Sequence, residues 1–284
     1  RGDVLLLSLF SLFAHIMRIL CRAKLILLTY FSESFPVTLL FILTGIVGGF
    51  IAGLGGPGVI PVIGLFYSHT GLSTAGMAGT TSSIFFFATV FASSMYYYSG
   101  DVNWKLVLPL IPATLIGTAA GARLNFMLSR QLFGIFVSLL VMVIGAAIVF
   151  REYKDLKPVI DVDYTTREGK AVILIIGLAV GIVGGAFGVG GPALSIPLLI
   201  FTGVPALQAI GAGLVQGIFV TSSTAINYIF RGEIAVDLVV LVGLPYLFSQ
   251  IVGWYLAQNM QTRSLKIALG GMLVLLGPYL LVSI

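Results

Sequence analysis

Long apolar runs of nearly equal length constrain this chain more than any other feature. In the first half they cover residues 36–54, 74–98, 106–122 and 132–150, and each approaches the roughly 20 residues that a membrane-spanning helix requires. Only 9% of the residues are charged, against about 25% in soluble domains. The runs also lack the alternation of a transmembrane β-strand. The sequence therefore predicts an all-α, multi-pass integral protein of the cell membrane.

The remaining composition argues against several other classes. The 15 basic residues behind the net charge of +5 are scattered among short loops, a pattern typical of topology signals and not of a nucleic-acid surface. Cys21 is the sole cysteine, so we expect neither an intramolecular disulfide nor a thiolate metal cluster. No cofactor is predicted. Residues 1–32 combine an apolar stretch with basic residues, and we expect an interfacial helix at 4–30; a first spanning helix is the alternative.

The chain also contains an internal repeat. Gly71 and Gly203 stand 203 − 71 = 132 residues apart. The same offset aligns Gly79 with Gly211, Tyr96 with Tyr228, Gly100 with Gly232, and Gly121 with Gly253. We therefore predict a tandem duplication, with a first repeat at 33–150 and a second at 171–284. The linker at 151–170 holds ten of the 25 charged residues, and we expect it in the cytoplasm.

Each repeat is predicted to contain one discontinuous helical segment followed by three continuous helices. The expected segments are 36–66, 72–98, 104–127 and 130–150, then 171–201, 205–230, 234–258 and 262–283. If each broken segment crosses the membrane once, the chain has about eight spans and both repeats share one orientation. This arrangement agrees with an excess of basic residues on the linker side, and we favour it. If each broken segment dips in and returns, the repeats are inverted and three spans remain in each.

The two discontinuities carry glycine and proline in matching order, "GLGGPG" at 53–58 and "GVGGPA" at 188–193. Unpaired backbone groups at membrane depth are tolerated only inside protein or beside a polar cavity. Because proline suits the first position of a helix, we expect a half-helix to restart at each proline. Helix N-termini attract anions through free N–H groups and partial positive charge. The predicted substrate site comprises Gly55, Gly56, Pro57, Gly58, Gly190, Gly191, Pro192 and Ala193.

Close packing between helices is the alternative explanation for glycine in a membrane protein. We expect it for the scattered glycines, which have no adjacent proline: Gly45, Gly117, Gly121, Gly177 and Gly181.

The broken segments resemble those of the TauE/SafE family of membrane transporters, also called the sulfite exporter family. The resemblance rests on "GFIAGLGGPGVIPVIGLF" at 49–66, "GIVGGAFGVGGPALSIPLLI" at 181–200 and "YYYSGDVNWKLVLPLIPATLIGTAAGARL" at 96–124. It covers about 36–284 and leaves residues 1–32 outside. The resemblance implies export of small anions, often sulfite, thiosulfate or organosulfonates, without ATP hydrolysis. Family members often have a third glycine where Pro57 and Pro192 stand, so each break here lacks one backbone donor.

Polar side chains on the next helix of each repeat are candidates to complete the site. Thr80, Thr81, Ser82 and Ser83 form a row within 72–98, and Gln216 and Asn227 lie within 205–230. Successive residues turn by about 100° around a helix, so only one or two of the row can face one cavity. Serine and threonine hydroxyls usually bond to a carbonyl one turn back. An amide facing lipid is costly, which favours a functional or interhelical role for Gln216.

No charged residue is expected in the middle third of a span. Anion binding would therefore depend on N–H groups, hydroxyls and amides, and proton coupling would need a proton carried by the substrate. An intramembrane enzyme would need a catalytic cluster at depth, which this sequence lacks. We predict a secondary transporter, an exporter of a small anion such as sulfite or an organosulfonate, with the anion bound near the midplane. An anion channel is the alternative, and a homo-oligomer is compatible with the sequence.

Overall fold

The computed structural model describes residues 35–124, 130–154, 164, 166–188, 191–230, 232 and 234–283. Regular structure in this part of the chain is entirely α-helical, which confirms the predicted class. Six helices among the described residues are long and apolar enough to cross a membrane. The expected N-terminal helix and half of the 151–170 linker lie outside the described residues.

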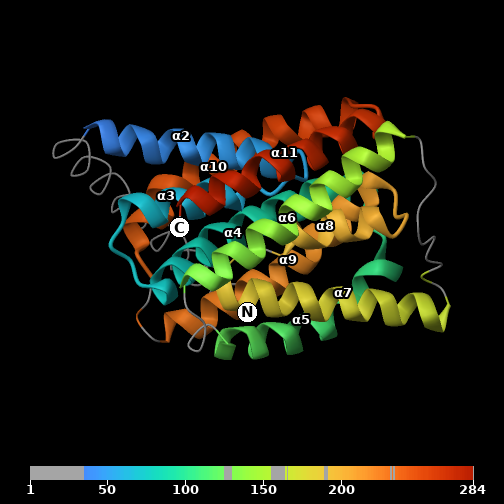
Figure 1. Ribbon diagram of the computed structural model, residues 1–284, viewed down its shortest axis with the longest axis horizontal. Coiled ribbons are helices and arrows are strands. Elements are labelled where there is room, and N and C mark those ends of the chain that lie inside the picture. Colours follow the sequence, from blue (N-terminus) through green and yellow to red (C-terminus); the bar gives the residue numbers. More distant parts are fainter. Residues whose placement is uncertain are drawn as a thin grey trace, which may run out of the picture.

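The helices follow the expected segments closely. The first half contains α2 (Phe35–Gly53), α3 (Val59–His69), α4 (Thr74–Tyr98), α5 (Trp104–Leu124) and α6 (Arg130–Tyr153). The second half contains α7 (Arg167–Phe187), α8 (Pro192–Phe201), α9 (Ala206–Ile229), α10 (Val236–Asn259) and α11 (Thr262–Ser283). Both predicted discontinuities are present, one between α2 and α3 and the other between α7 and α8 (Figure 1).

The first broken segment is a hairpin. The ring of Phe41 in α2 lies 6.1 Å from the ring of Phe66 near the end of α3, in an edge-to-face arrangement. Near the break, a Cβ added to Gly48 would lie 2.6 Å from the carbonyl oxygen of Gly58. Gly58 thus lies beside Gly48, and Phe66 lies beside Phe41. Helix α3 therefore runs antiparallel to α2, back toward the start of α2.

The second broken segment also returns to the end at which it begins. The Asn103 side-chain amide donates hydrogen bonds to the hydroxyl of Tyr164 (3.3 Å) and to Oε1 of Gln208 (3.0 Å). Tyr164 precedes α7, and Gln208 lies in the first turn of α9, shortly after α8 ends. The two hairpins therefore enter the molecule from opposite ends, α2 from the left and α7 from the right in Figure 1.

This path differs from the single crossing that we favoured from the sequence. The count of about eight spans depended on that crossing, so it does not carry over to this fold. The physical reason lies at the first break, where Gly55 has a φ of 84°. This left-handed conformation suits glycine, and it reverses the chain so that apolar faces of α2 and α3 bury against each other.

Each hairpin packs against a helix from the other half of the chain. A Cβ added to Gly45 of α2 would lie 2.6 Å from the carbonyl oxygen of Val242 in α10. A Cβ on Gly177 of α7 would lie 2.9 Å from the carbonyl oxygen of Leu110 in α5. Such short distances require glycine. They confirm the packing role expected for the scattered glycines Gly45, Gly117, Gly121, Gly177 and Gly181.

Helices α4 and α9 cross at the centre of the molecule in opposite directions. The Ala235 N–H, just before α10, donates to Thr80 Oγ1 near the start of α4 (3.0 Å). At the other end, a Cβ on Gly211 of α9 would lie 2.7 Å from the carbonyl oxygen of Asp101, just after α4. Between these ends the hydroxyls of Thr89 and Thr221 are 3.5 Å apart. The tips of both hairpins lie beside this crossing.

Candidate functional site

The two hairpin tips meet around one cavity. The first tip contributes Gly56, Gly58 and Val59, and the second contributes Pro192 and Ala193. The other lining residues are Ala52, Phe85, Ala88, Thr89, Leu214, Tyr246 and Gln250. The cavity has a volume of about 30 Å³, room for one or two water molecules. The two tips therefore border a small shared space.

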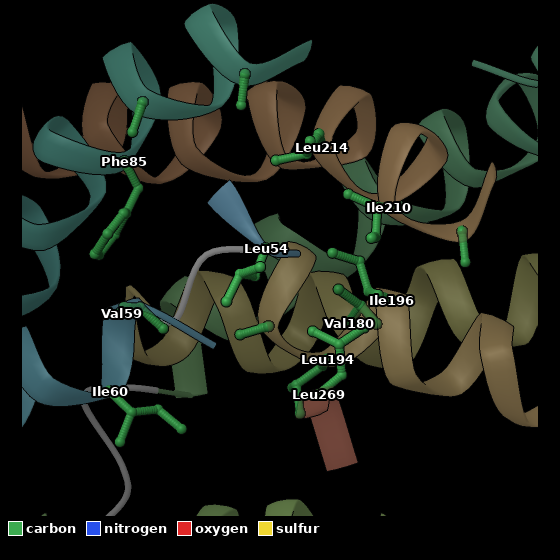
Figure 2. Close-up of a cluster of buried hydrophobic side chains, with 14 of the residues drawn as sticks. Leu54, Val59, Ile60, Phe85, Val180, Leu194, Ile196, Ile210, Leu214 and Leu269 are labelled. Carbon is green, nitrogen blue, oxygen red and sulfur yellow. The ribbon is translucent and has the colours of Figure 1, made fainter. Parts of the chain in front are cut away.

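An apolar layer surrounds this junction. Figure 2 shows Leu54 and Val59 of the first tip lying between Phe85 of α4 and Leu194 of α8. All four side chains are at least 97% buried. Because the walls are apolar, the few polar groups that reach the cavity are poorly screened and interact strongly with a charged solute.

The first tip is built by a glycine-terminated helix end. The Gly55 N–H donates to the Ala52 carbonyl (2.9 Å), and the Gly56 N–H donates to the Ile51 carbonyl (2.8 Å). This pair of bonds is a Schellman motif, in which the residue with positive φ closes the last turn. The motif therefore occupies the N–H groups of Gly55 and Gly56, which we had expected to be available to an anion.

The restart of the first half-helix differs from the expectation. Helix α3 begins at Val59 with Gly58 as its N-cap, so Pro57 precedes the cap instead of occupying the first helical position. The Gly58 N–H donates to the Gly56 carbonyl (2.9 Å), and the Ile60 N–H donates to the Pro57 carbonyl (3.1 Å). For the Val59 N–H, the described residues provide no acceptor. Val59 is one of the residues that line the cavity.

The second tip restarts as predicted, with Pro192 as the first residue of α8 and Gly191 as its N-cap. The N–H groups of Leu194 and Ser195 both donate to the Gly191 carbonyl (3.3 and 3.0 Å). The N–H of Ala193 has no acceptor within the part of the chain that the structure describes. Since Ala193 also lines the cavity, each tip contributes one lining residue whose N–H has no acceptor among the described residues.

Two further polar side chains line the cavity, and neither was singled out from the sequence. Gln250 of α10 is 1% exposed, and its Oε1 has no hydrogen-bond partner among the residues described. Thr89 of α4 donates its hydroxyl to the Phe85 carbonyl (2.7 Å). We singled out Gln216 from the sequence because an amide facing lipid is costly. The same argument applies to Gln250 and could have identified it as a candidate.

The row of hydroxyls on α4 spreads around the helix and does not converge on the cavity. Thr81 donates to the Met77 carbonyl (2.7 Å), and Ser83 donates to the Gly79 carbonyl (2.8 Å). Ser82 is buried, and its hydroxyl has no partner in the described chain. Thr80 binds the N–H that precedes α10. The hydroxyls of this row therefore mainly form hydrogen bonds within α4 or to a neighbouring segment.

The other predicted residues are also apart from the cavity. Gln216 is buried and donates its amide to Thr114 Oγ1 (2.6 Å), which joins α9 to α5. Asn227 is exposed and donates to the Ser223 carbonyl one turn back (2.7 Å). Gly55 and Pro57 line a smaller apolar space of about 10 Å³ beside the cavity. Gly190 lies outside the described residues.

Replacing Thr80 with valine should lower the free energy of unfolding by about 1–3 kcal/mol, because the Ala235 N–H would lose its buried acceptor. Thermal unfolding of the detergent-solubilised protein measures the change. Ser83→Ala is the matched control, since the Ser83 hydroxyl bonds only within its own helix. Equal stability of Thr80→Val and the wild type would refute the role given to Thr80.

Comparison with known proteins adds the family. The family model described as "Sulfite exporter TauE/SafE" matches residues 4–148 and 173–284. The chain belongs to the TauE/SafE family. The match includes most of residues 1–32, which the quoted motifs had left outside the resemblance. Since the family model covers both halves and both breaks, this is a multi-pass membrane protein from a family of transporters.

Two relatives from different organisms align with this chain over most of their length and have a similar description. One, from Methanocaldococcus jannaschii, is 24% identical over 269 residues, which cover 87% of this chain and 92% of the relative. The other, YdhB of Bacillus subtilis, is 28% identical over 240 residues, which cover 82% of this chain and 92% of YdhB. Both are named "probable membrane transporter protein". No solved structure matches this TauE/SafE chain.

Proposed function

We propose that this TauE/SafE protein is a secondary transporter that exports a small anion such as sulfite or an organosulfonate. The anion binds in the cavity between the hairpin tips. The observation that carries the proposal is the composition of that cavity. Its lining combines a buried glutamine with one residue from each tip whose N–H has no acceptor among the described residues, and it includes no cationic side chain. Donors of this kind bind an anion moderately, as a transporter requires for release.

We further propose that the fold is an inverted pair of repeats, each formed by one hairpin and three spanning helices. Equivalent contacts support it, because the offset of 132 residues relates Gly45 to Gly177 and Val242 to Leu110, and these form the same contact on opposite sides. Thr89 and Thr221 are related by the same offset and contact each other. An inverted pair offers the site to either membrane face in turn.

The charges support a cytoplasmic location for the linker end. The Gln258 amide near the end of α10 donates to Asp101 just before α5 (2.7 Å), so the starts of α5, α7 and α11 lie at one end. Basic residues in the described chain concentrate there: Lys105, Lys154, Arg167, Lys170, Arg263 and Lys266. Arg123 and Arg130 lie at the other end. The positive-inside rule then orients the protein.

The proposal is tested by sulfite flux in proteoliposomes. A carrier gives saturable uptake and counterflow, whereas the alternative, an anion channel, gives a linear flux that follows the gradient alone. Counterflow of sulfite, with no flux in protein-free vesicles, supports the proposal. Linear flux would instead identify the protein as an anion channel. The absence of sulfite or sulfonate movement in both directions would overturn the proposal.

Replacing Ala193 with leucine should reduce sulfite flux at least about tenfold, because the added carbons fill the cavity at the second tip. Overpacking itself costs about 1–3 kcal/mol, so retention of the folded state is checked by size-exclusion chromatography. Ala146→Leu makes the same change at an exposed position on α6 and should transport normally. Wild-type flux in Ala193→Leu would place the anion elsewhere.

A further inference from the structure

A second, larger cavity lies at the linker end of the molecule, outside the transport site. It has a volume of about 560 Å³ and is lined by Lys105, Leu108, Pro109, Tyr164 and Lys170. The first three belong to α5, Lys170 belongs to α7, and Tyr164 precedes α7. None of these residues lines the cavity between the hairpin tips.

The wall of this cavity is held in place by Asn103. Its Oδ1 accepts the Lys105 N–H (3.1 Å) at the start of α5. Its side-chain amide donates to the Tyr164 hydroxyl (3.3 Å) and to Gln208 of α9 (3.0 Å). One side chain thus fixes the starts of three helices, so the two lysines extend from a rigid base.

The charges of this cavity come from two lysines. Lys105 and Lys170 are exposed and lie in the first turns of α5 and α7, where the helix macrodipole disfavours a cation. Neither ammonium forms an ion pair with a carboxylate of the described residues. Two lysines that face one cavity also repel each other. A bound anion would relieve both costs.

The cavity also has an apolar side that faces outward. Leu108 is 64% exposed, and Trp104, one turn earlier, is 48% exposed. Both lie on α5, one of the helices long and apolar enough to cross a membrane. Tryptophan and lysine at the end of such a helix mark the boundary between headgroups and acyl chains. The cationic and apolar parts of the cavity therefore match the two parts of a phospholipid.

We propose that this cavity binds an anionic phospholipid, with the phosphate between Lys105 and Lys170 and an acyl chain along Leu108 and Pro109. Basic pockets between transmembrane helices on the cytoplasmic side recognise such headgroups. The same two ammonium groups could attract a free oxyanion, but a free anion gains nothing from the exposed leucine and proline. The apolar wall favours the lipid.

The experiment is native mass spectrometry of the full chain in detergent, with phosphatidylglycerol, phosphatidylcholine or inorganic phosphate added. Phosphatidylglycerol should bind to the wild type and bind about 30-fold more weakly to the double variant Lys105→Gln/Lys170→Gln. The control double variant Arg123→Gln/Lys154→Gln removes the same charge from exposed positions that do not line the cavity, and should bind like the wild type. Lys105→Arg/Lys170→Arg should retain binding.

Several outcomes would overturn the proposal. Equal loss in both glutamine double variants would indicate a response to net charge alone. Equal binding of phosphatidylcholine would remove the preference for an anionic headgroup. Competition by inorganic phosphate at the concentration at which the lipid binds would identify a free-anion site. Thermal unfolding of the lipid-free variants verifies that each is folded, and sulfite flux in the same preparations keeps this result separate from the transport proposal.

Discussion

Replacing Gln250 with glutamate is expected to abolish sulfite transport. The carboxylate would lie in an apolar cavity that Val59 and Ala193 also line, and it would compete with the anion for their N–H groups. In its ionised form the glutamate also repels the substrate directly, because like charges a few ångströms apart in an apolar interior interact by several kcal/mol. Flux should then fall at least about 100-fold.

Three companion variants make this result interpretable. Gln250→Leu removes the amide without adding charge, and it should reduce flux about tenfold through the loss of one hydrogen bond to a charged group. Gln261→Glu introduces the same carboxylate at an exposed position and should leave transport unchanged. Asn227→Leu changes an exposed amide that the structure places away from the cavity. Wild-type flux in Gln250→Glu would exclude the cavity as the anion site.

Gly121→Ala and Gly253→Ala should each lower the free energy of unfolding by about 3 kcal/mol or more, since added atoms in a packed interface force the backbones apart. The two glycines occupy equivalent positions in the two halves. A Cβ on Gly121 would collide with the carbonyl oxygen of Ile182, and a Cβ on Gly253 would collide with that of Phe50. Neither collision can be relieved by rotating a side chain.

The matched control is Gly271→Ala in α11. A Cβ at Gly271 meets no heavy atom within 4 Å, so alanine should stabilise the helix by up to about 1 kcal/mol. Thermal unfolding in one detergent, read by tryptophan fluorescence, compares the three variants. Equal behaviour of Gly121→Ala and Gly271→Ala would contradict the packing argument, and a loss in only one of the equivalent pair would contradict the proposed symmetry.

The sequence predicted the positions of the helices because lipid makes their length and composition obligatory. It also predicted both breaks, since Gly-Gly-Pro cannot continue a helix. The return of α3 along α2 was the alternative that we did not favour, and the sequence could not decide it because the contact between Phe41 and Phe66 forms only in the fold. These two residues are 25 positions apart in an apolar run that would suit a single crossing equally well.

The sequence predicted which backbone segments approach each other, whereas their role in binding stays a prediction. Gly56, Gly58, Pro192 and Ala193 line one cavity, because the breaks themselves shape the hairpin tips. The side chains were less predictable. Thr80 and Gln216 form buried hydrogen bonds between helices, and nothing in their local sequence distinguishes this role from binding. Gln250 is on α10, far along the chain from either break, and only the tertiary fold brings it to the cavity.

The exchange of partners between the halves has a consequence for biosynthesis. Glycines of α2 fit against α10, and those of α7 fit against α5. When the first half leaves the ribosome, the helices that pack against α2 and α5 have not yet been synthesised. Once α7 is translated it can pack against α5, but α2 has no partner until α10 is translated. Helices are thus inserted in sequence, whereas the bundle closes only near the end of synthesis.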